Sequence, residues 1–277
     1  MTTQADKGRG FRDLHARTRA FIIPNPWDAG TARLLSQRGF EALATTSAGC
    51  AFSAGQRDNT VGRDQMIAHV AAIASATDLP VSADLENGYG DDPGSVAETI
   101  RRAAAAGAAG GSIEDATGRP ADPLYEMELA AERIAAAAEI VRGLDVPFIL
   151  TARAENYLVG RPGLADTIRR LQAYQSAGAD VLYAPGLTSP DDIATVVRSL
   201  DRPVNVLAGM VGTRLSLTDF SAMGVRRVSV GSLLSRAALG AFLRAASEML
   251  GPGTFSFADE AVSYRDLNEM FERGTNG

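Results

Sequence analysis

VSADLENGYGDDPGSVAETIRRAAAAGA, residues 81–108, holds one complete strand–loop–helix unit of this chain. Residues 81–86 have the composition of a buried strand, except that Asp84 and Glu86 interrupt its apolar side chains. Side chains two positions apart on a strand point to the same face. An Asp-Pro pair then opens an alanine-rich helical pattern that ends near a glycine. The stretch therefore predicts a βα unit with two carboxylates at the carboxyl end of its strand.

The same unit recurs along the chain. Its apolar, β-rich runs are AFII (20–23), ALATTS (42–47), VSADLE (81–86), GSIED (111–115), FILTAR (148–153), DVLYAP (180–185), VNVLAG (204–209) and RVSVGS (227–232). Helical patterns fill most of the gaps, and strand alternating with helix predicts a parallel sheet. Eight units in about 250 residues favour a (β/α)₈ TIM barrel. An open doubly wound sheet remains an alternative, although no G-x-G-x-x-G motif follows the first strand.

The chain is predicted to be a single barrel domain, 1–277, in which residues 235–277 form a C-terminal helical extension. The last helical pattern carries an apolar stripe of Val262, Leu267, Met270 and Phe271. This stripe requires a surface to pack on, either a partner subunit or the chain's own barrel.

Composition excludes several classes of function. The chain has 277 residues, 45% hydrophobic and 22% charged, with a net charge of −6, which is ordinary for a soluble enzyme. The negative charge argues against nucleic acid or an anionic membrane as a partner. No apolar run approaches the roughly 20 residues of a membrane span, and the N-terminus lacks the apolar core of a secretory signal. With the single Cys50, these features predict a cytoplasmic protein.

Scarce residue types narrow the chemistry further. The chain has one lysine, Lys7, in an N-terminal segment that looks loose, and two histidines, His15 and His69. A Schiff-base or pyridoxal phosphate enzyme needs a buried lysine, and a zinc site normally recruits His or Cys. Charge chemistry therefore falls to Asp, Glu, Arg, Tyr and a hard metal ion.

Carboxylates gather where the predicted strands end. The carboxyl ends of barrel strands form the functional face, so Asp84, Glu86 and Glu114 are expected to converge there. Converging acids repel each other, and Mg²⁺, or Mn²⁺ in its place, relieves that repulsion through oxygen ligands. The alternative is that these acids are solvated or paired with nearby arginines.

Other strand ends supply candidate contacts to a substrate. Arg153 suits bidentate binding of a carboxylate or phosphoryl group, or serves as a structural partner of Glu114 or Glu155. Ser47, Ala48 and Gly49 offer backbone N–H groups to an anion or simply form a tight turn, and Thr46 before them is a further candidate contact. Asp58 reaches the metal's waters or caps the next helix. The remaining candidates, each a ligand contact or a packing residue, are Trp27, Tyr89, Tyr183 and Asn205.

Taken in order, the motifs resemble the isocitrate lyase / phosphoenolpyruvate mutase superfamily. They are NPWD (25–28), TSAG (46–49), QRD (56–58), ADLENGYG (83–90), SIED (112–115), TAR (151–153), GAD (178–180) and VGS (230–232). The resemblance implies a (β/α)₈ barrel with Mg²⁺ held by Asp84, while Glu86 and Glu114 reach the ion directly or through water. It implies that residues 47–49 cradle a 2-oxo acid and that Arg153 pairs with its carboxylate. It also implies terminal helices exchanged between the subunits of a homodimer or homotetramer.

One segment departs from the family pattern. The isocitrate and methylisocitrate lyases carry a Lys-Lys/Arg-Cys-Gly-His motif in the loop after the fourth strand, and the mutase branch carries a Lys and an Asn. Here that loop, residues 116–125, reads ATGRPADPLY, without Lys, Cys, His or Asn. The mutase branch's His is also missing near Tyr183. The resemblance therefore implies the shared part of the mechanism, which is a metal, an enolate and a small carboxylate.

The leading hypothesis is a Mg²⁺-dependent lyase that cleaves a C–C bond of, or decarboxylates, a small 2-oxo or 2-hydroxy (di)carboxylate. Asp84, Glu86 and Glu114 would serve the metal, and Asp58, Arg153 and Glu114 the reaction. One alternative is a hydrolase or mutase of a phosphonopyruvate-type P–C bond. Another is a protein that binds 2-oxo acids without turnover.

Overall fold

The computed structural model describes residues 2–210 and 214–272. Eight parallel strands form one sheet in the order β1-β10-β9-β8-β7-β4-β3-β2. Their bounds are β1 Phe21–Ile23, β2 Leu43–Ala44, β3 Val81–Asp84, β4 Gly110–Glu114, β7 Ile149–Arg153, β8 Val181–Tyr183, β9 Val204–Leu207 and β10 Arg227–Ser229. Each strand overlaps one of the eight predicted runs, so the predicted parallel sheet is confirmed.

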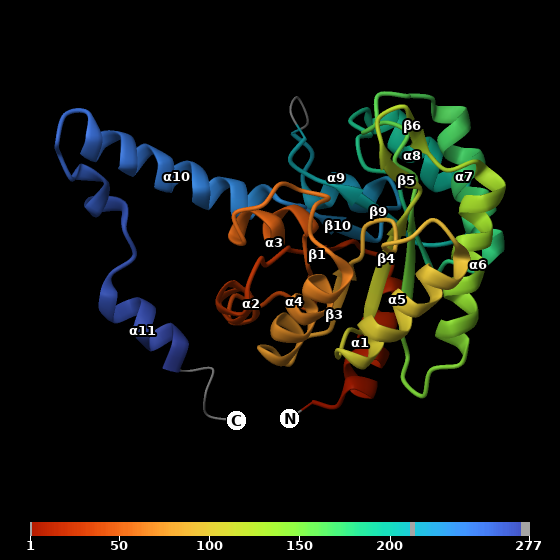
Figure 1. Cartoon of the computed structure of the whole chain (residues 1–277), viewed down its shortest axis with the longest axis horizontal. Coiled ribbons are helices and arrows are strands. Elements are labelled where there is room, and N and C mark those ends of the chain that lie inside the picture. The colour runs from red at the N-terminus through yellow and green to blue at the C-terminus, as the bar shows by residue number, and fades with distance from the viewer. Residues whose placement is uncertain (1, 211–213, 273–277) are drawn as a thin grey trace.

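The sheet curls into a nearly closed, TIM-like barrel (Figure 1). β1 and β2 are the two ends of the strand order. The N–H of Ala44 in β2 donates to the carbonyl of Pro24, the residue after β1, at 3.0 Å. This bond brings the two edges together, and the carboxyl ends of the strands consequently face one mouth.

Helices cover the outside of the strands (Figure 1). They are α2 Ala29–Ser36, α3 Ser47–Ser53, α4 Arg63–Ser75, α5 Pro93–Ala105, α6 Met127–Arg142, α7 Leu164–Ala177, α8 Pro190–Arg198 and α9 Leu217–Ala222. α5 begins as its sequence predicts, because the Asp92 carboxylate caps the N–H of Ser95 and Pro93 occupies the first turn. Its buried face includes Val96 and Ile100, both fully buried, which contribute about 1.5–3 kcal/mol each by burial.

A helix that the sequence analysis did not predict, α1 Gln4–Ala16, precedes the first strand. Its Phe11 and Leu14 pack with Phe21 and other strand residues in one buried cluster. The expectation of a loose N-terminal segment is wrong, because Lys7 Nζ donates to the carbonyl oxygens of Ala74 and Thr77 at 3.3 and 2.6 Å.

The segment after β4 is a hairpin rather than an irregular loop. β5 Ala116–Arg119 and β6 Asp122–Leu124 pair antiparallel, and Gly118 adopts a left-handed φ of 73° within β5, where the pairing register shifts. The Arg119 guanidinium holds the hairpin to Asp91 through contacts of 2.9 and 3.0 Å. Tyr125 donates its hydroxyl to the same carboxylate at 2.6 Å.

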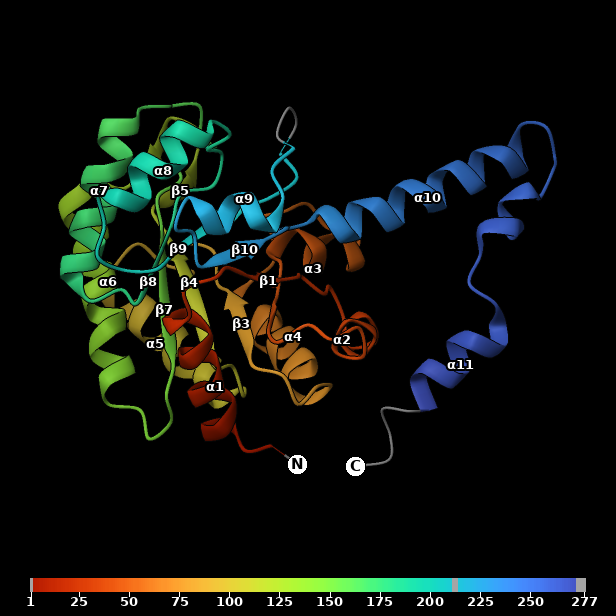
Figure 2. The ribbon, with the colours of Figure 1, turned by 180° about the vertical axis from the view of Figure 1, so that it is seen from behind.

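The C-terminal helices leave the barrel. α10 Leu233–Leu250 projects outward, and after η1 Ser256–Glu260 the helix α11 Tyr264–Glu272 runs back (Figures 1 and 2). In the predicted apolar stripe, Val262 is 61% exposed, whereas the Met270 carbonyl accepts a bond from Gln37 of the α2 region at 2.6 Å. The chain's own barrel therefore covers only part of that stripe. Among the described residues, no helix is long and apolar enough to cross a bilayer.

Candidate active site

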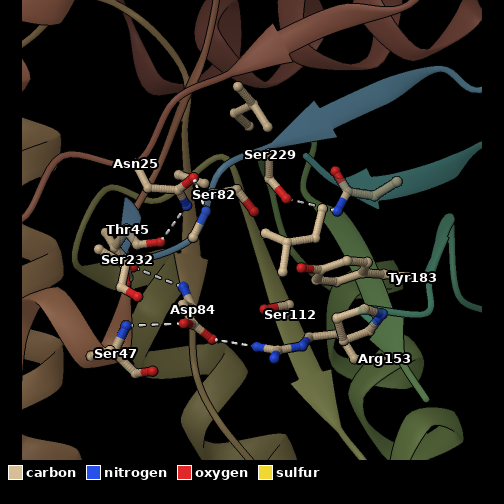
Figure 3. Close-up of a pocket in the computed structure, with 18 of the residues that line it drawn as sticks. Asn25, Thr45, Ser47, Ser82, Asp84, Ser112, Arg153, Tyr183, Ser229 and Ser232 are labelled. Carbon is tan, nitrogen blue, oxygen red and sulfur yellow. Dashed lines mark hydrogen bonds and ion pairs between the residues drawn. The ribbon is translucent and has the colours of Figure 1, made fainter. Parts of the chain in front are cut away.

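A cavity of about 160 Å³ lies inside the mouth of the barrel (Figure 3). It is smaller than the roughly 300–1,000 Å³ of sites for drug-sized ligands, so it suits a compact molecule. Among the predicted site residues, those in its lining are Thr46, Ser47, Ala48, Asp58, Asp84, Arg153, Tyr183 and Asn205. Glu114 lines an adjoining cavity beneath the β5–β6 hairpin, which shares Ser47, Asp58 and Arg153 with the first.

Four predicted residues, Trp27, Gly49, Glu86 and Tyr89, are absent from both linings. Gly49 has a packing role, because a Cβ there would lie 2.8 Å from the Cβ of Trp27. Its N–H donates to the Thr46 side chain, which caps α3. Thr46 to Ala48 thus reach the cavity, while Gly49 and Trp27 pack behind its wall.

Asp84, the last residue of β3, lies at the centre of the site (Figure 3). Its Oδ2 accepts the backbone N–H of Ser47 at 2.9 Å, and its Oδ1 accepts a bond from Arg153 Nη1 at 2.9 Å. Its own N–H donates to Thr45 Oγ1 at 2.8 Å. The start of α3 is therefore joined directly to the end of β3, and the carboxylate orientation is fixed.

Arg153, at the end of β7, pairs with three carboxylates. Its nitrogens lie 2.9 Å from Asp84, 3.1 Å from Glu114 and 2.7 Å from Glu155. Burial acts to lower the pKa of Arg153, but these carboxylates outweigh burial and raise that pKa well above its ordinary value. Arg153 is thus a structural partner of Glu114 and Glu155, as one of the two predicted roles required. Three carboxyl groups therefore surround one guanidinium at the mouth.

The acids around Asp84 are held in environments that favour the protonated form. Burial, reinforced by Asp84 and Asp58, raises the pKa of Glu86 to about 8, and Glu86 Oε1 is buried without a hydrogen-bond partner. Burial and Asp84 also raise the pKa of Asp58, whose carboxylate hydrogen-bonds Ser47. Burial raises the pKa of Glu114, although Arg153 opposes that shift.

These features fit a hard cation near Asp84 and Glu86. An unpartnered buried carboxylate oxygen and an excess of mutually repelling acids are what a divalent ion would relieve. The predicted trio is nevertheless not assembled, because Arg153 lies between Asp84 and Glu114. Within residues 2–210 and 214–272, no three His, Cys, Asp or Glu side chains are placed to ligate one ion.

The loop after β3 is shaped by Arg133, a residue that the sequence analysis did not single out. Arg133 of α6 is 1% exposed, and its guanidinium donates to the carbonyl oxygens of Asn87, Gly90 and Asp91. Glu86 and Tyr89 have left-handed φ values of 48° and 61°, which non-glycine residues rarely adopt. The buried cation thus holds the loop in a strained form that positions Glu86.

Asp115 fixes the segment after β7 in a similar way. Its Oδ1 accepts the N–H of Glu155 at 2.8 Å, and its Oδ2 accepts bonds from Arg170 and Tyr174 at 3.0 and 2.5 Å. Glu155, and through it Arg153, is therefore positioned by a buried polar network.

Arg227 is the largest omission of the sequence analysis. It is the first residue of β10, is 4% exposed and lines the cavity. Site residues were predicted only at the carboxyl ends of strands, whereas Arg227 begins its strand. A charged side chain at the start of an apolar run was the available signal.

Comparisons with known proteins agree with this architecture. A profile of the phosphoenolpyruvate phosphomutase family matches residues 11–250. The crystal structure of a Burkholderia cenocepacia J2315 protein, provisionally named a lyase/mutase, is 63% identical, covers 97% of this chain and 96% of that chain, and superposes with a TM-score of 0.95. The uncharacterized protein Rv1998c of Mycobacterium tuberculosis H37Rv is 35% identical over 85% of this chain and 87% of that protein.

More distant relatives carry named activities. An oxaloacetate decarboxylase of Rhodopseudomonas palustris BisA53 is 29% identical over 77% of this chain and 72% of that protein. The structure of 2,3-dimethylmalate lyase is 26% identical, with TM-score 0.84, and covers 98% of this chain and 95% of that chain. The structure of phosphonopyruvate hydrolase with oxalate and Mg²⁺ is 26% identical, with TM-score 0.86, and covers 99% of this chain and 96% of that chain. Barrel, ordered motifs and family match together show that the chain belongs to the PEP mutase/isocitrate lyase superfamily.

Proposed function

We propose that this chain is a Mg²⁺-dependent carbon–carbon lyase or decarboxylase of a small 2-oxo or 2-hydroxy dicarboxylate. The observation that carries the proposal is Asp84, fixed between the Ser47 N–H and Arg153 over a cavity of about 160 Å³ and surrounded by acids with raised pKa values. Relatives of this superfamily include lyases and a decarboxylase, and one was crystallised with oxalate and Mg²⁺.

In this proposal Asp84 and Glu86 would hold the ion, and Glu114 would reach it through water. The ion would supply positive charge where negative charge develops on the substrate's oxo oxygen. The chain's residues then orient the substrate. Ser47 and Ala48 flank one end of the oxo acid, while Arg153 supplies a guanidinium for a carboxylate.

Decarboxylation suits the sequence of residues 116–125. Breaking the bond between a carboxylate and the adjacent carbon releases CO₂ and leaves the electron pair on an enolate, which then takes up one proton. The leaving group needs no proton, so the absence of Lys, Cys and His from ATGRPADPLY is compatible with this step. Asp58 is the proposed proton donor, because burial and Asp84 raise its pKa.

The test uses Asp84→Ala, with the distant exposed Asp201→Ala as a matched control. Pyruvate release from oxaloacetate and from 2-methylmalate-type substrates is measured with Mg²⁺ and with EDTA, and the spontaneous rate is subtracted. Asp84→Ala should lower metal-dependent turnover by about 10²-fold or more, while the control is unchanged. Unchanged turnover in Asp84→Ala would refute the site assignment. Phosphate release from phosphonopyruvate in the same assay would instead support the P–C reaction, and metal-dependent binding of 2-oxo acids without any product would support the non-catalytic alternative.

We also propose that the C-terminal helices pack on a partner copy in a homodimer or homotetramer. α10 exposes Phe242, Leu243 and Leu250 at 67, 62 and 90%, an apolar surface that favours burial in an assembly. Light scattering should give the mass of a dimer or tetramer for the full chain, and Leu243→Asp should reduce that mass. A monomeric wild-type chain would contradict the proposal.

A further inference from the structure

Arg227 belongs to a row of residues that crosses four neighbouring strands. The register pairs Arg153 with Tyr183, Tyr183 with Asn205, and Asn205 with Arg227. Arg153 ends β7, whereas Arg227 begins β10. The row therefore descends from the mouth of the barrel towards its floor, and all four residues line the same cavity. The cavity thus has one arginine near each end.

The guanidinium of Arg227 is held firmly but incompletely. Its Nε donates to Asn205 Oδ1 at 2.9 Å, and its Nη2 donates to Thr151 Oγ1 at 3.1 Å. Its Nη1 is buried and has no partner. Two fixed nitrogens leave the third donor in a defined place, which is the arrangement of a binding group rather than of a mobile side chain.

Arg227 also lacks a counter-charge. Arg153 and Arg170 each pair with carboxylates, but none of the ion pairs found among the described residues includes Arg227. Burial, with a smaller contribution from Arg153, lowers its pKa to about 10, so it remains a cation at neutral pH. An unpaired buried charge is costly unless an anion joins it.

His15 offers a simpler explanation, which must be tested. Its Nδ1 bonds the Phe11 carbonyl at 2.8 Å, and its Nε2 is also buried without a partner. A water between His15 Nε2 and Arg227 Nη1 would satisfy one donor and one acceptor. That water would carry no charge, so Arg227 would still lack a counter-ion.

We propose that Arg227, oriented by Asn205 and Thr151, forms a subsite at the floor of the cavity that binds the second carboxylate of a dicarboxylate substrate. Arg227 is thereby a specificity residue that distinguishes dicarboxylates from monocarboxylates of the same shape. The subsite lies at the opposite end of the cavity from Asp84 and Ser47. The inference rests on the proposed function for the class of substrate.

The experiment compares two stable ligands by calorimetry in the presence of Mg²⁺. Malate and 2-hydroxybutyrate differ because a carboxylate in the first replaces a methyl group in the second. The variant is Arg227→Met, which keeps length and removes charge. The control is Arg226→Met at the adjacent position. The wild-type Arg226 does not line the cavity, and its Nη1 donates to the Gly224 carbonyl.

Wild type and Arg226→Met should bind malate more tightly than 2-hydroxybutyrate by about 10- to 100-fold. Arg227→Met should weaken malate binding by a similar factor. Its affinity for 2-hydroxybutyrate should stay within about 3-fold of the wild-type affinity. Unchanged malate affinity in Arg227→Met, or equal weakening of both ligands, overturns the subsite. If Arg227→Met does not fold, a crystal structure of the wild type with malate and Mg²⁺ decides. A carboxylate oxygen bonded to Nη1 supports the subsite, and a water or chloride there overturns it.

The two proposals fail separately. A wild-type chain that shows Arg227-dependent malate binding but turns over none of the substrates keeps the subsite and loses the lyase. A chain that decarboxylates oxaloacetate equally well with Arg227→Met keeps the lyase and loses the subsite. A wild type that binds neither acid and turns over none of the substrates refutes both.

Discussion

His15 makes the stability of this protein depend on pH in a predictable direction. Burial, assisted by the positive charge of Arg227, lowers the pKa of His15 to about 3, whereas an unfolded histidine titrates near 6.5. Between these two pKa values His15 is protonated in the unfolded chain and neutral in the folded chain. The free energy of unfolding therefore falls as the pH drops below about 6.5. At about 1.4 kcal/mol per pH unit, the loss by pH 5 is about 2 kcal/mol.

The assay is urea unfolding of the wild type and His15→Phe at about pH 7.5 and about pH 5. Phenylalanine keeps an aromatic ring against Phe11 and Phe21, whose ring centroids lie 4.7 and 5.1 Å from that of His15. Between the two pH values the wild type should lose about 2 kcal/mol more stability than the variant. Buried acids such as Glu86, whose raised pKa stabilises the fold as pH falls, act equally in both proteins and cancel. If both proteins lost the same unfolding free energy between the two pH values, His15 would not be the source of the pH dependence.

Three further changes test the supports of the site. Arg133→Met, which leaves three loop carbonyls unsatisfied, should lower the unfolding free energy by about 3 kcal/mol or more, while the exposed Arg101→Met changes it by about 0.5 kcal/mol or less. Asp115→Asn should cost about 3 kcal/mol, because Arg170 then keeps only the more exposed Asp166 as a counter-charge; a loss below about 1 kcal/mol would contradict this. Burial, then Glu86, raises the pKa of Cys50 to about 11, so Ellman's reagent should label Cys50 at about pH 8 only after denaturation.

Strand and helix periodicity was enough to predict the barrel. The eight apolar runs are short and separated by amphipathic helices, and a parallel sheet buried on both faces requires that pattern. The hairpin β5–β6 escaped prediction because its segment, ATGRPADPLY, lacks any apolar alternation. Its pairing is held instead by long-range contacts from Arg119 and Tyr125 to Asp91. α1 escaped because its first turn is polar and only Gly8, Phe11, Leu14 and His15 of its residues are buried.

In the candidate site too, some features were predicted from the sequence and others were not. Asp84 and Arg153 were both predicted at the mouth because the ends of parallel strands face it, and they lie 2.9 Å apart. The pairing of Arg153 with Glu114 or Glu155 was one of two open alternatives, and the structure shows both pairs. Arg133 lies on a covering helix and carries no sequence signal of its contacts with the loop after β3, whereas Arg227 had only the weak signal of a charge at the start of an apolar run.

By itself, the sequence determined that a parallel eight-unit barrel would form and that acidic side chains would collect at its mouth. Both follow from local periodicity and from the shared direction of the strands. Only the tertiary structure decided which charges are paired. Burial and strand register placed Arg153 among three carboxylates and left Glu86 Oε1 and Arg227 Nη1 without partners. Those pairings depend on distances between residues far apart in the chain, and a one-dimensional pattern contains no such distances.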